Sequence, residues 1–218
     1  MNRCLPRLAP AALVAALLLA PVAAQAGAQK EEALAPSVVV GLTKAVADAP
    51  APPDWADRAS LQPWLAEMSR RIAHKVADER ERRELLVTVH YEATRAALDP
   101  QLVLGVIYHE SGFKKYAVSV AGARGYMQVM PFWPGLLGAR DQNLFNLRTN
   151  LRYGAVILKH YLDIENGDLY RALGRYNGSL GRPEYPHAVM AATNRHFAYG
   201  GGASAPAATA AIGTPAPR

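Results

Sequence analysis

The sequence predicts a mostly α-helical protein with a single helical domain over residues 61–199 and a small loop or hairpin region within it. Apolar residues recur at helical spacing in segments on both sides of that region. Between those segments, residues 113–135 combine glycines and prolines with β-branched and aromatic residues. This composition is typical of loops and hairpins, and it interrupts the helical pattern.

Three helices are expected in the first half of the domain. The first covers residues 61–76, and the second begins near Asp78. Asp99 and Pro100 supply an N-cap and a proline at the first position of a third helix, which runs to Glu110. Because the residues within this third helix are nearly all apolar, we expect it to be buried on most sides.

Helical spacing resumes after the loop region. One helix is expected over residues 151–162, ending near Gly167, and Asp168 caps a short helix through Tyr176. A last apolar face extends over residues 185–196. The domain is therefore expected to close with three helices.

The first 26 residues have the pattern of a secretory signal peptide. Arg3 and Arg7 precede an apolar run over residues 11–20, and Ala24-Gln25-Ala26 is a small-x-small site that predicts cleavage after Ala26. The run is shorter than the about 20 apolar residues that span a bilayer, so an uncleaved anchor is the less favoured alternative. We therefore expect a periplasmic or secreted protein with no integral membrane anchor after cleavage.

The segments that flank the domain have biased compositions. Residues 27–60 are rich in alanine and proline and predict a flexible lead-in. Residues 200–218 form a low-complexity segment without apolar periodicity, expected to be a disordered tail. Both could act as linkers or as tethers to a partner.

Cysteine content and charge exclude several classes of function. The single cysteine, Cys4, lies within the predicted signal, so the mature chain would have no disulfide, cysteine metal site or cysteine nucleophile. The net charge is 24 − 18 = +6. No basic run interleaved with aromatic residues indicates a nucleic-acid partner, whereas a mild positive charge suits an anionic polymer such as the cell wall.

Glu110 is the candidate catalytic residue because of where it lies. It ends a helix that is otherwise almost entirely apolar, so burial and the negative end of the helix dipole both raise the pKa of its carboxyl group. Acid-catalysed cleavage of a glycosidic bond requires such a protonated acid near neutral pH. From position alone, a capping residue or an ion pair with Lys114 or Lys115 is the alternative.

The segment that follows makes the catalytic interpretation the stronger one. The stretch His109–Pro131, HESGFKKYAVSVAGARGYMQVMP, resembles the signature of soluble lytic transglycosylases, which are relatives of goose-type lysozyme. Three shorter matches follow, at 150–154 (NLRYG), 172–178 (ALGRYNG) and 185–190 (YPHAVM). The resemblance covers residues 80–198 and implies a lysozyme-like α+β fold whose loop region lines a substrate cleft.

The resemblance also implies roles for individual residues. Glu110 would be the sole catalytic acid/base. Ser119 would help to orient its carboxyl group or the substrate's N-acetyl group, and the Tyr185 hydroxyl would lie close to it. The residues expected to contact substrate are Ser119, Gln128, Met130, Tyr176, Asn177 and Tyr185. No metal or cofactor is implied, and Phe113 stands where a zinc-binding His-Glu-x-x-His pattern needs its second histidine.

The activity implied is that of a peptidoglycan lytic transglycosylase, which cleaves the MurNAc–GlcNAc β-1,4 bond and leaves a 1,6-anhydro-MurNAc end. Two alternatives stay open: a lysozyme-type muramidase, and a wall-binding or assembly protein of a secretion or conjugation system. Departures from the family pattern at Lys115, Tyr126, Trp133 and Ser179 concern subsite shape. Trp133 is expected either to stack on sugars or to belong to the core.

Overall fold

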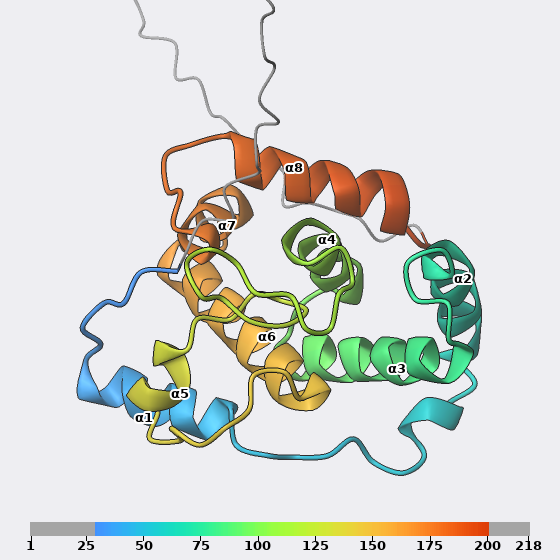
Figure 1. The fold of residues 1–218 in the computed structure, drawn as a ribbon, viewed down its shortest axis with the longest axis horizontal. Coiled ribbons are helices and arrows are strands. Elements are labelled where there is room, and N and C mark those ends of the chain that lie inside the picture. Colours follow the sequence, from blue (N-terminus) through green and yellow to red (C-terminus); the bar gives the residue numbers. More distant parts are fainter. Residues whose placement is uncertain (1–28, 201–218) are drawn as a thin grey trace, which may run out of the picture.

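The protein was analysed as a computed structural model that describes residues 29–200 (Figure 1). Eight α-helices and two short helical turns make up its regular structure, confirming the mostly helical fold. In chain order they are α1 (Pro36–Ala45), η1 (Trp55–Asp57), α2 (Gln62–Ile72), α3 (Glu79–Arg95), α4 (Pro100–Glu110), α5 (Phe132–Leu136), α6 (Leu147–Ile164), α7 (Leu169–Asn177), α8 (Glu184–Ala192) and the π-helical turn η2 (Thr193–Phe197).

Side-chain caps fix where most of the long helices begin. Asp78 accepts a hydrogen bond from the Glu81 amide at 2.7 Å, and Asp99 accepts one from the Gln101 amide at 2.8 Å. Asp168 caps α7 in the same way. These caps satisfy amide groups that have no partner within the helix, so they confirm the predicted starts of α3, α4 and α7.

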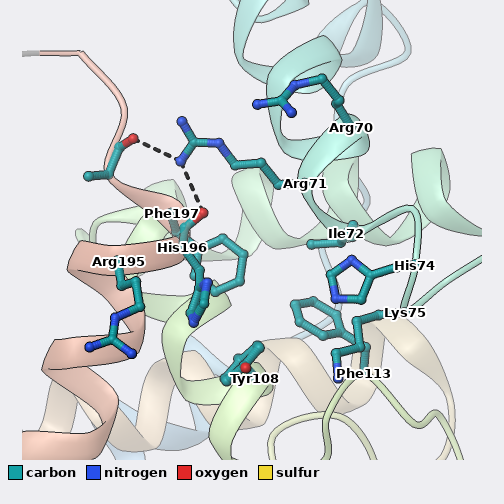
Figure 2. A pocket seen from close by; sticks show the side chains of 11 residues that line it. Arg70, Arg71, Ile72, His74, Lys75, Tyr108, Phe113, Arg195, His196 and Phe197 are labelled. Atoms are coloured by element: carbon teal, nitrogen blue, oxygen red, sulfur yellow. Dashed lines mark hydrogen bonds between the residues drawn. The ribbon is translucent and has the colours of Figure 1, made fainter.

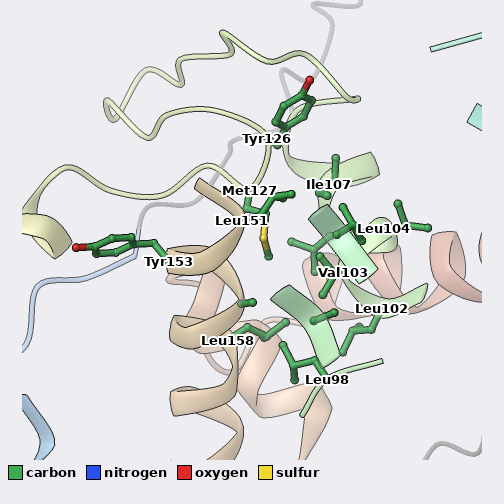
Figure 3. Packing of buried hydrophobic residues seen from close by; sticks show 14 of the residues in the cluster. Leu98, Leu102, Val103, Leu104, Ile107, Tyr126, Met127, Leu151, Tyr153 and Leu158 are labelled. Atoms are coloured by element: carbon green, nitrogen blue, oxygen red, sulfur yellow. The ribbon is translucent and has the colours of Figure 1, made fainter. Parts of the chain in front are cut away.

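Helix α4 lies at the centre of the domain, with α3 and α6 below it and α8 above it in Figure 1. Its residues 102–107 are all buried, and Figure 3 shows Met127 between α4 and α6. On the opposite side α8 and η2 approach closely at Gly105, where an added Cβ would lie 2.0 Å from the Thr193 hydroxyl. The burial expected from the apolar sequence is therefore confirmed.

The segment between α4 and α6 is mostly loop. Two isolated antiparallel bridges, Val118 to Arg124 and Arg124 to Val129, tie it together, and no extended strand forms within residues 29–200. The short helix α5 was not expected from the sequence. Its five residues include Trp133 and Pro134, both buried, so packing and not intrinsic helical propensity holds this turn.

The prediction of a flexible lead-in over residues 27–60 is wrong for much of that segment. Residues 36–45 form α1, which carries Pro36 at its first turn and buries Leu42. Val46, one turn later, is 3% exposed and joins the same core. Apolar residues at helical spacing can bury a stripe against α6, which the high alanine and proline content obscured.

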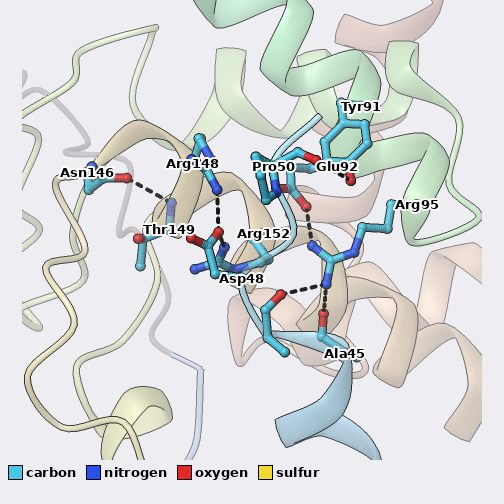
Figure 4. Close-up of polar contacts among 11 residues, drawn as sticks. Ala45, Asp48, Pro50, Tyr91, Glu92, Arg95, Asn146, Arg148, Thr149 and Arg152 are labelled. Carbon is cyan, nitrogen blue, oxygen red and sulfur yellow. Dashed lines mark hydrogen bonds and ion pairs between the residues drawn. The ribbon is translucent and has the colours of Figure 1, made fainter. Parts of the chain in front are cut away.

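Polar contacts hold the chain that follows α1 (Figure 4). The Arg95 guanidinium on α3 donates to the Ala45 and Ala47 carbonyls at the end of α1. Asp48 accepts from both Arg148 and Arg152 of α6. This segment is therefore connected to two helices of the domain.

Two other sequence predictions fall outside the described residues. They are the signal peptide, residues 1–26, and the disordered tail, which apart from Gly200 lies beyond the described part of the chain. Across residues 29–200, no helix has the length and apolar character needed to cross a bilayer.

Packing of α1 can be measured by unfolding. We expect Leu42→Ala to lower the free energy of unfolding by about 2 kcal/mol, because it removes apolar contacts and leaves a cavity. Val40 lies on the same helix but is 69% exposed, so Val40→Ala should change stability by less than about 0.5 kcal/mol. Equal effects of the two substitutions in urea denaturation would contradict the packing of α1.

Candidate active site

The Glu110 carboxyl group lies at the last residue of α4 and receives a hydrogen bond from the Tyr185 hydroxyl of α8 at 2.5 Å. Burial raises its pKa to about 8, and the Tyr185 hydrogen bond lowers it by a smaller amount. The residue as a whole keeps part of its surface accessible. This carboxyl group is thus mostly protonated at neutral pH, yet it can exchange a proton with a bound molecule.

The backbone after Glu110 explains why the helix ends there. The Ser111 amide and hydroxyl both donate to the Ile107 carbonyl, at 3.1 and 3.2 Å. Gly112 and Phe113 then adopt positive φ angles of 56° and 69°, which turn the chain away from the helix axis. Phe113 is strained by this conformation for a non-glycine residue, and burial of its ring against Phe197 stabilises it.

The alternative of an ion pair for Glu110 does not fit the geometry. Lys114 is exposed, and the Lys115 ammonium lies over the Tyr116 ring at 5.5 Å. Across residues 29–200, neither lysine forms an ion pair with Glu110. The environment of Glu110 is therefore one that desolvates its charge without neutralising it.

Two buried tyrosines accompany Glu110. Burial, followed by the nearby Glu110 charge, raises the pKa of both Tyr176 and Tyr185 well above the ordinary value. Both phenols are therefore neutral hydrogen-bond donors at neutral pH. Tyr176 donates to the Met127 carbonyl at 2.8 Å, which ties α7 to the loop, and Tyr185 donates to Glu110.

Several side chains expected to bind substrate also support the loop itself. The Gln128 amide nitrogen donates to the Ala117 and Gly125 carbonyls at 3.1 and 2.9 Å, and Gln128 is 4% exposed. The Ser119 hydroxyl accepts from the Ala123 amide at 3.0 Å. The structure thus places both residues in the loop beside α4, with these polar atoms directed to its backbone.

The other predicted site residues lie on separate elements. Met130 is partly buried in the loop just before α5, and Asn177 is buried at the end of α7, next to Tyr176. Trp133 is 2% exposed, so it belongs to the core and presents no free face on which a sugar could stack.

Asn150 is a site residue that sequence reasoning missed. Its side-chain oxygen accepts from the Met127 amide at 2.8 Å, and its nitrogen donates to the Arg124 and Leu144 carbonyls at 2.8 Å each. Gly125 must lack a side chain here, because a Cβ would lie 2.4 Å from the Asn150 amide nitrogen. An asparagine within an otherwise apolar helix face was the available signal.

Gln29 is a second residue that the sequence did not identify. Its side-chain oxygen accepts from the Met130 amide and the Trp133 indole, both at 3.1 Å. Its nitrogen donates to the Gln128 carbonyl at 3.3 Å. The predicted flexible lead-in therefore places a carboxamide next to two of the expected substrate-binding residues.

A separate cavity of about 450 Å³ opens between α2, α4 and η2 (Figure 2). Tyr108 lines it, stacked on His196 with ring centroids 4.8 Å apart. Tyr108 and Glu110 are two residues apart on α4, which is about 200° around the helix. The cavity therefore lies on another side of α4 from Glu110. Within residues 29–200, acidic, histidine and cysteine side chains form no cluster that could hold a metal ion.

Comparison with known families identifies the domain that carries this site. Residues 88–192 match the family described as the transglycosylase SLT domain. These residues are therefore similar to that family, and we refer to them below as the SLT domain. The SLT domain includes Glu110, both buried tyrosines and the whole loop, and it excludes α1 and α2.

Relatives with similar sequences come from a phage and from bacteria. A transglycosylase of Enterobacteria phage PRD1 is 34% identical over 56% of this chain and 47% of its own length. Membrane-bound lytic murein transglycosylase C of Actinobacillus pleuropneumoniae serotype 5b (strain L20) is 34% identical over 45% of this chain and 32% of its own length. The membrane-bound lytic murein transglycosylase C of Histophilus somni (strain 2336) is 32% identical over 50% of this chain and 34% of its own length. The chain thus spans less than half the length of these curated relatives.

The role of Asn150 in holding the loop can be tested against a cap on the same helix. Asn150→Ala should lower the free energy of unfolding by about 3 kcal/mol, because it leaves the buried Met127 amide and the Leu144 carbonyl without partners and removes one of two hydrogen bonds to the Arg124 carbonyl. Asn146 caps α6 at its exposed end, so Asn146→Ala should cost only about 1 kcal/mol. Equal losses in chemical denaturation would show that the Asn150 contacts contribute no more than a cap.

The raised pKa of Glu110 predicts a pH-dependent stability difference. Because its pKa rises from 4.5 to about 8 on folding, its contribution to stability is complete below pH 4.5 and is lost as the pH rises through 8. Glu110→Gln stays neutral, so its stability relative to the parent should increase between these pH values by roughly 2–4 kcal/mol. Glu184→Gln, at an exposed position, is the control. A pH-independent difference for Glu110→Gln would refute the raised pKa.

Proposed function

We propose that the SLT domain is a lytic transglycosylase that cleaves the MurNAc–GlcNAc β-1,4 bond of peptidoglycan, with Glu110 as its only general acid/base. The observation that carries this proposal is a carboxyl group with a pKa of about 8, hydrogen-bonded to a neutral tyrosine at the end of the central helix. An acid in this state is suited to protonating a glycosidic oxygen at neutral pH.

In the first step, Glu110 donates its proton to the oxygen between the two sugars. The bond from that oxygen to the MurNAc anomeric carbon breaks, and the GlcNAc residue leaves with a hydroxyl group. Positive charge develops at the anomeric carbon, where the substrate's own acetamide can stabilise it. The Glu110 carboxylate that forms is stabilised by the hydroxyl of Tyr185.

In the second step, the Glu110 carboxylate removes the proton from the MurNAc 6-hydroxyl. That oxygen bonds to the anomeric carbon and closes the 1,6-anhydro ring. Glu110 is again protonated, so one residue serves as acid and then as base, and no water is consumed. Supporting this assignment, the influences on the Glu110 pKa within residues 29–200 are burial and Tyr185, with no second carboxylate among them.

The remaining parts of the proposal concern substrate contacts and location. Ser119, Gln128, Met130, Tyr176 and Asn177 are the residues that we propose line the cleft beside Glu110. Export through the predicted signal peptide would bring the domain to the wall. A secretion or conjugation machine as partner stays a prediction from the sequence.

The products released from purified peptidoglycan test this function. Mass spectrometry should detect anhydromuropeptides with the parent protein and at least a thousandfold less with Glu110→Gln, with activity declining as the pH rises through about 8. Glu184→Gln should retain activity, since it is exposed on α8. Reducing-end muropeptides would instead establish a muramidase. Binding without release by the parent protein would favour a wall-binding role.

A further inference from the structure

The carboxamide of Gln29 is buried, and hydrogen bonds with surrounding groups fix both of its polar atoms. It is 4% exposed, and its two polar atoms pair with three groups of the loop and α5. The oxygen accepts two hydrogen bonds at 3.1 Å, from the Met130 amide and the Trp133 indole, and the nitrogen donates one to the Gln128 carbonyl at 3.3 Å. Together these groups form a cradle for one amide.

This cradle is connected to the catalytic carboxyl group. Gln29 donates to the Gln128 carbonyl, and the Tyr176 hydroxyl donates to the carbonyl of the preceding residue, Met127. The Glu110 charge acts on both Tyr176 and Tyr185, and Tyr185 donates directly to Glu110. Gln29 therefore belongs to the same buried polar cluster as the proposed acid, although it precedes the SLT domain by almost sixty residues.

The chemistry of the cradle matches the substrate of the proposed function. Each sugar of peptidoglycan carries an acetamido group, which has one carbonyl acceptor and one N–H donor. A primary carboxamide presents the same two functions at the same separation. We propose that Gln29 is an internal substrate mimic, whose carboxamide occupies the position of a substrate acetamido group and competes with the glycan strand for the cleft.

The mimic affects selectivity as well as affinity. Displacing Gln29 uncovers the Met130 amide, the Trp133 indole and the Gln128 carbonyl, which need new hydrogen-bond partners. An acetamido sugar satisfies these groups, whereas a sugar with only hydroxyl groups at that position does not place the same donor and acceptor. Since the competent cleft is only fractionally populated, the apparent KM rises by the inverse of that fraction.

The segment that carries Gln29 has few other attachments to the cleft. Lys30, Glu31 and Glu32 are exposed, and Glu32 reaches Arg175 at 3.8 Å. The main anchor comes later, where α1 buries Leu42. The chain between Gln29 and α1 can therefore release the carboxamide while the rest of the lead-in stays in place.

This inference rests on the proposed function, and two measurements separate them. The first is binding of tri-N-acetylchitotriose, followed by tryptophan fluorescence, because Trp133 is a direct partner of Gln29. Gln29→Ala in the otherwise complete mature chain should bind this oligosaccharide about tenfold more tightly than the parent. The second is turnover of peptidoglycan, in which the substitution should lower KM about tenfold and leave kcat within twofold.

Two further variants sharpen the test. Gln29→Glu has the same shape but presents an acceptor to the Gln128 carbonyl, so it should increase oligosaccharide affinity as Gln29→Ala does. Glu31→Ala changes an exposed neighbour and should match the parent in both measurements.

Unchanged oligosaccharide affinity and KM in Gln29→Ala, with reduced stability, would show that Gln29 is merely structural and would overturn the mimic alone. Tighter binding without turnover by any variant would support the mimic and reject the transglycosylase. Absence of oligosaccharide binding in parent and variants alike would overturn both.

Discussion

Burial of the Glu110 carboxyl group at the end of an apolar helix is the constraint on which the rest of this site depends. Removing a carboxylate from water raises its pKa, and only partial compensation by Tyr185 keeps the group able to ionise. A lysine paired with Glu110 would keep its carboxyl group ionised at neutral pH. Burial without any hydrogen-bond donor would keep it protonated. Helix α4 determines how deeply the Glu110 carboxyl group is buried, and α8 supplies the Tyr185 hydroxyl that donates to it.

The loop beside α4 has almost no regular structure, yet side-chain hydrogen bonds define its shape. Asn150 of α6 accepts from the Met127 amide, and Tyr176 of α7 donates to the Met127 carbonyl. Within the loop, the Gln128 side chain donates to the Gly125 carbonyl. Each contact satisfies a backbone group that strands would satisfy in a sheet. The loop is therefore held both by hydrogen bonds from the neighbouring helices and by its own two isolated bridges.

Local signals in the sequence predicted the starts of three helices and the burial of the helix that ends at Glu110. Asp99 and Asp168 cap the helices they were expected to cap, and Asp78 caps the helix expected to begin near it, because capping depends only on neighbouring residues. The contacts of Asn150 and Gln29 could not be derived in this way, since their partners lie 23 and about 100 residues away. Helix α1 was missed because three valines and a leucine lie within an alanine- and proline-rich segment, and only tertiary packing shows which of them are buried.

The close approach of α4 and η2 at Gly105 has a consequence for proton affinity. Tyr185 reaches Glu110 from α8, and α8 continues directly into η2, whose Thr193 hydroxyl occupies the space of the missing Cβ. The missing side chain of Gly105 therefore lets α4 and η2 lie close together, which keeps Tyr185 within hydrogen-bond distance of Glu110. The pKa of Glu110 thus depends on helix packing at Gly105, which lies more than one helical turn away from the carboxyl group.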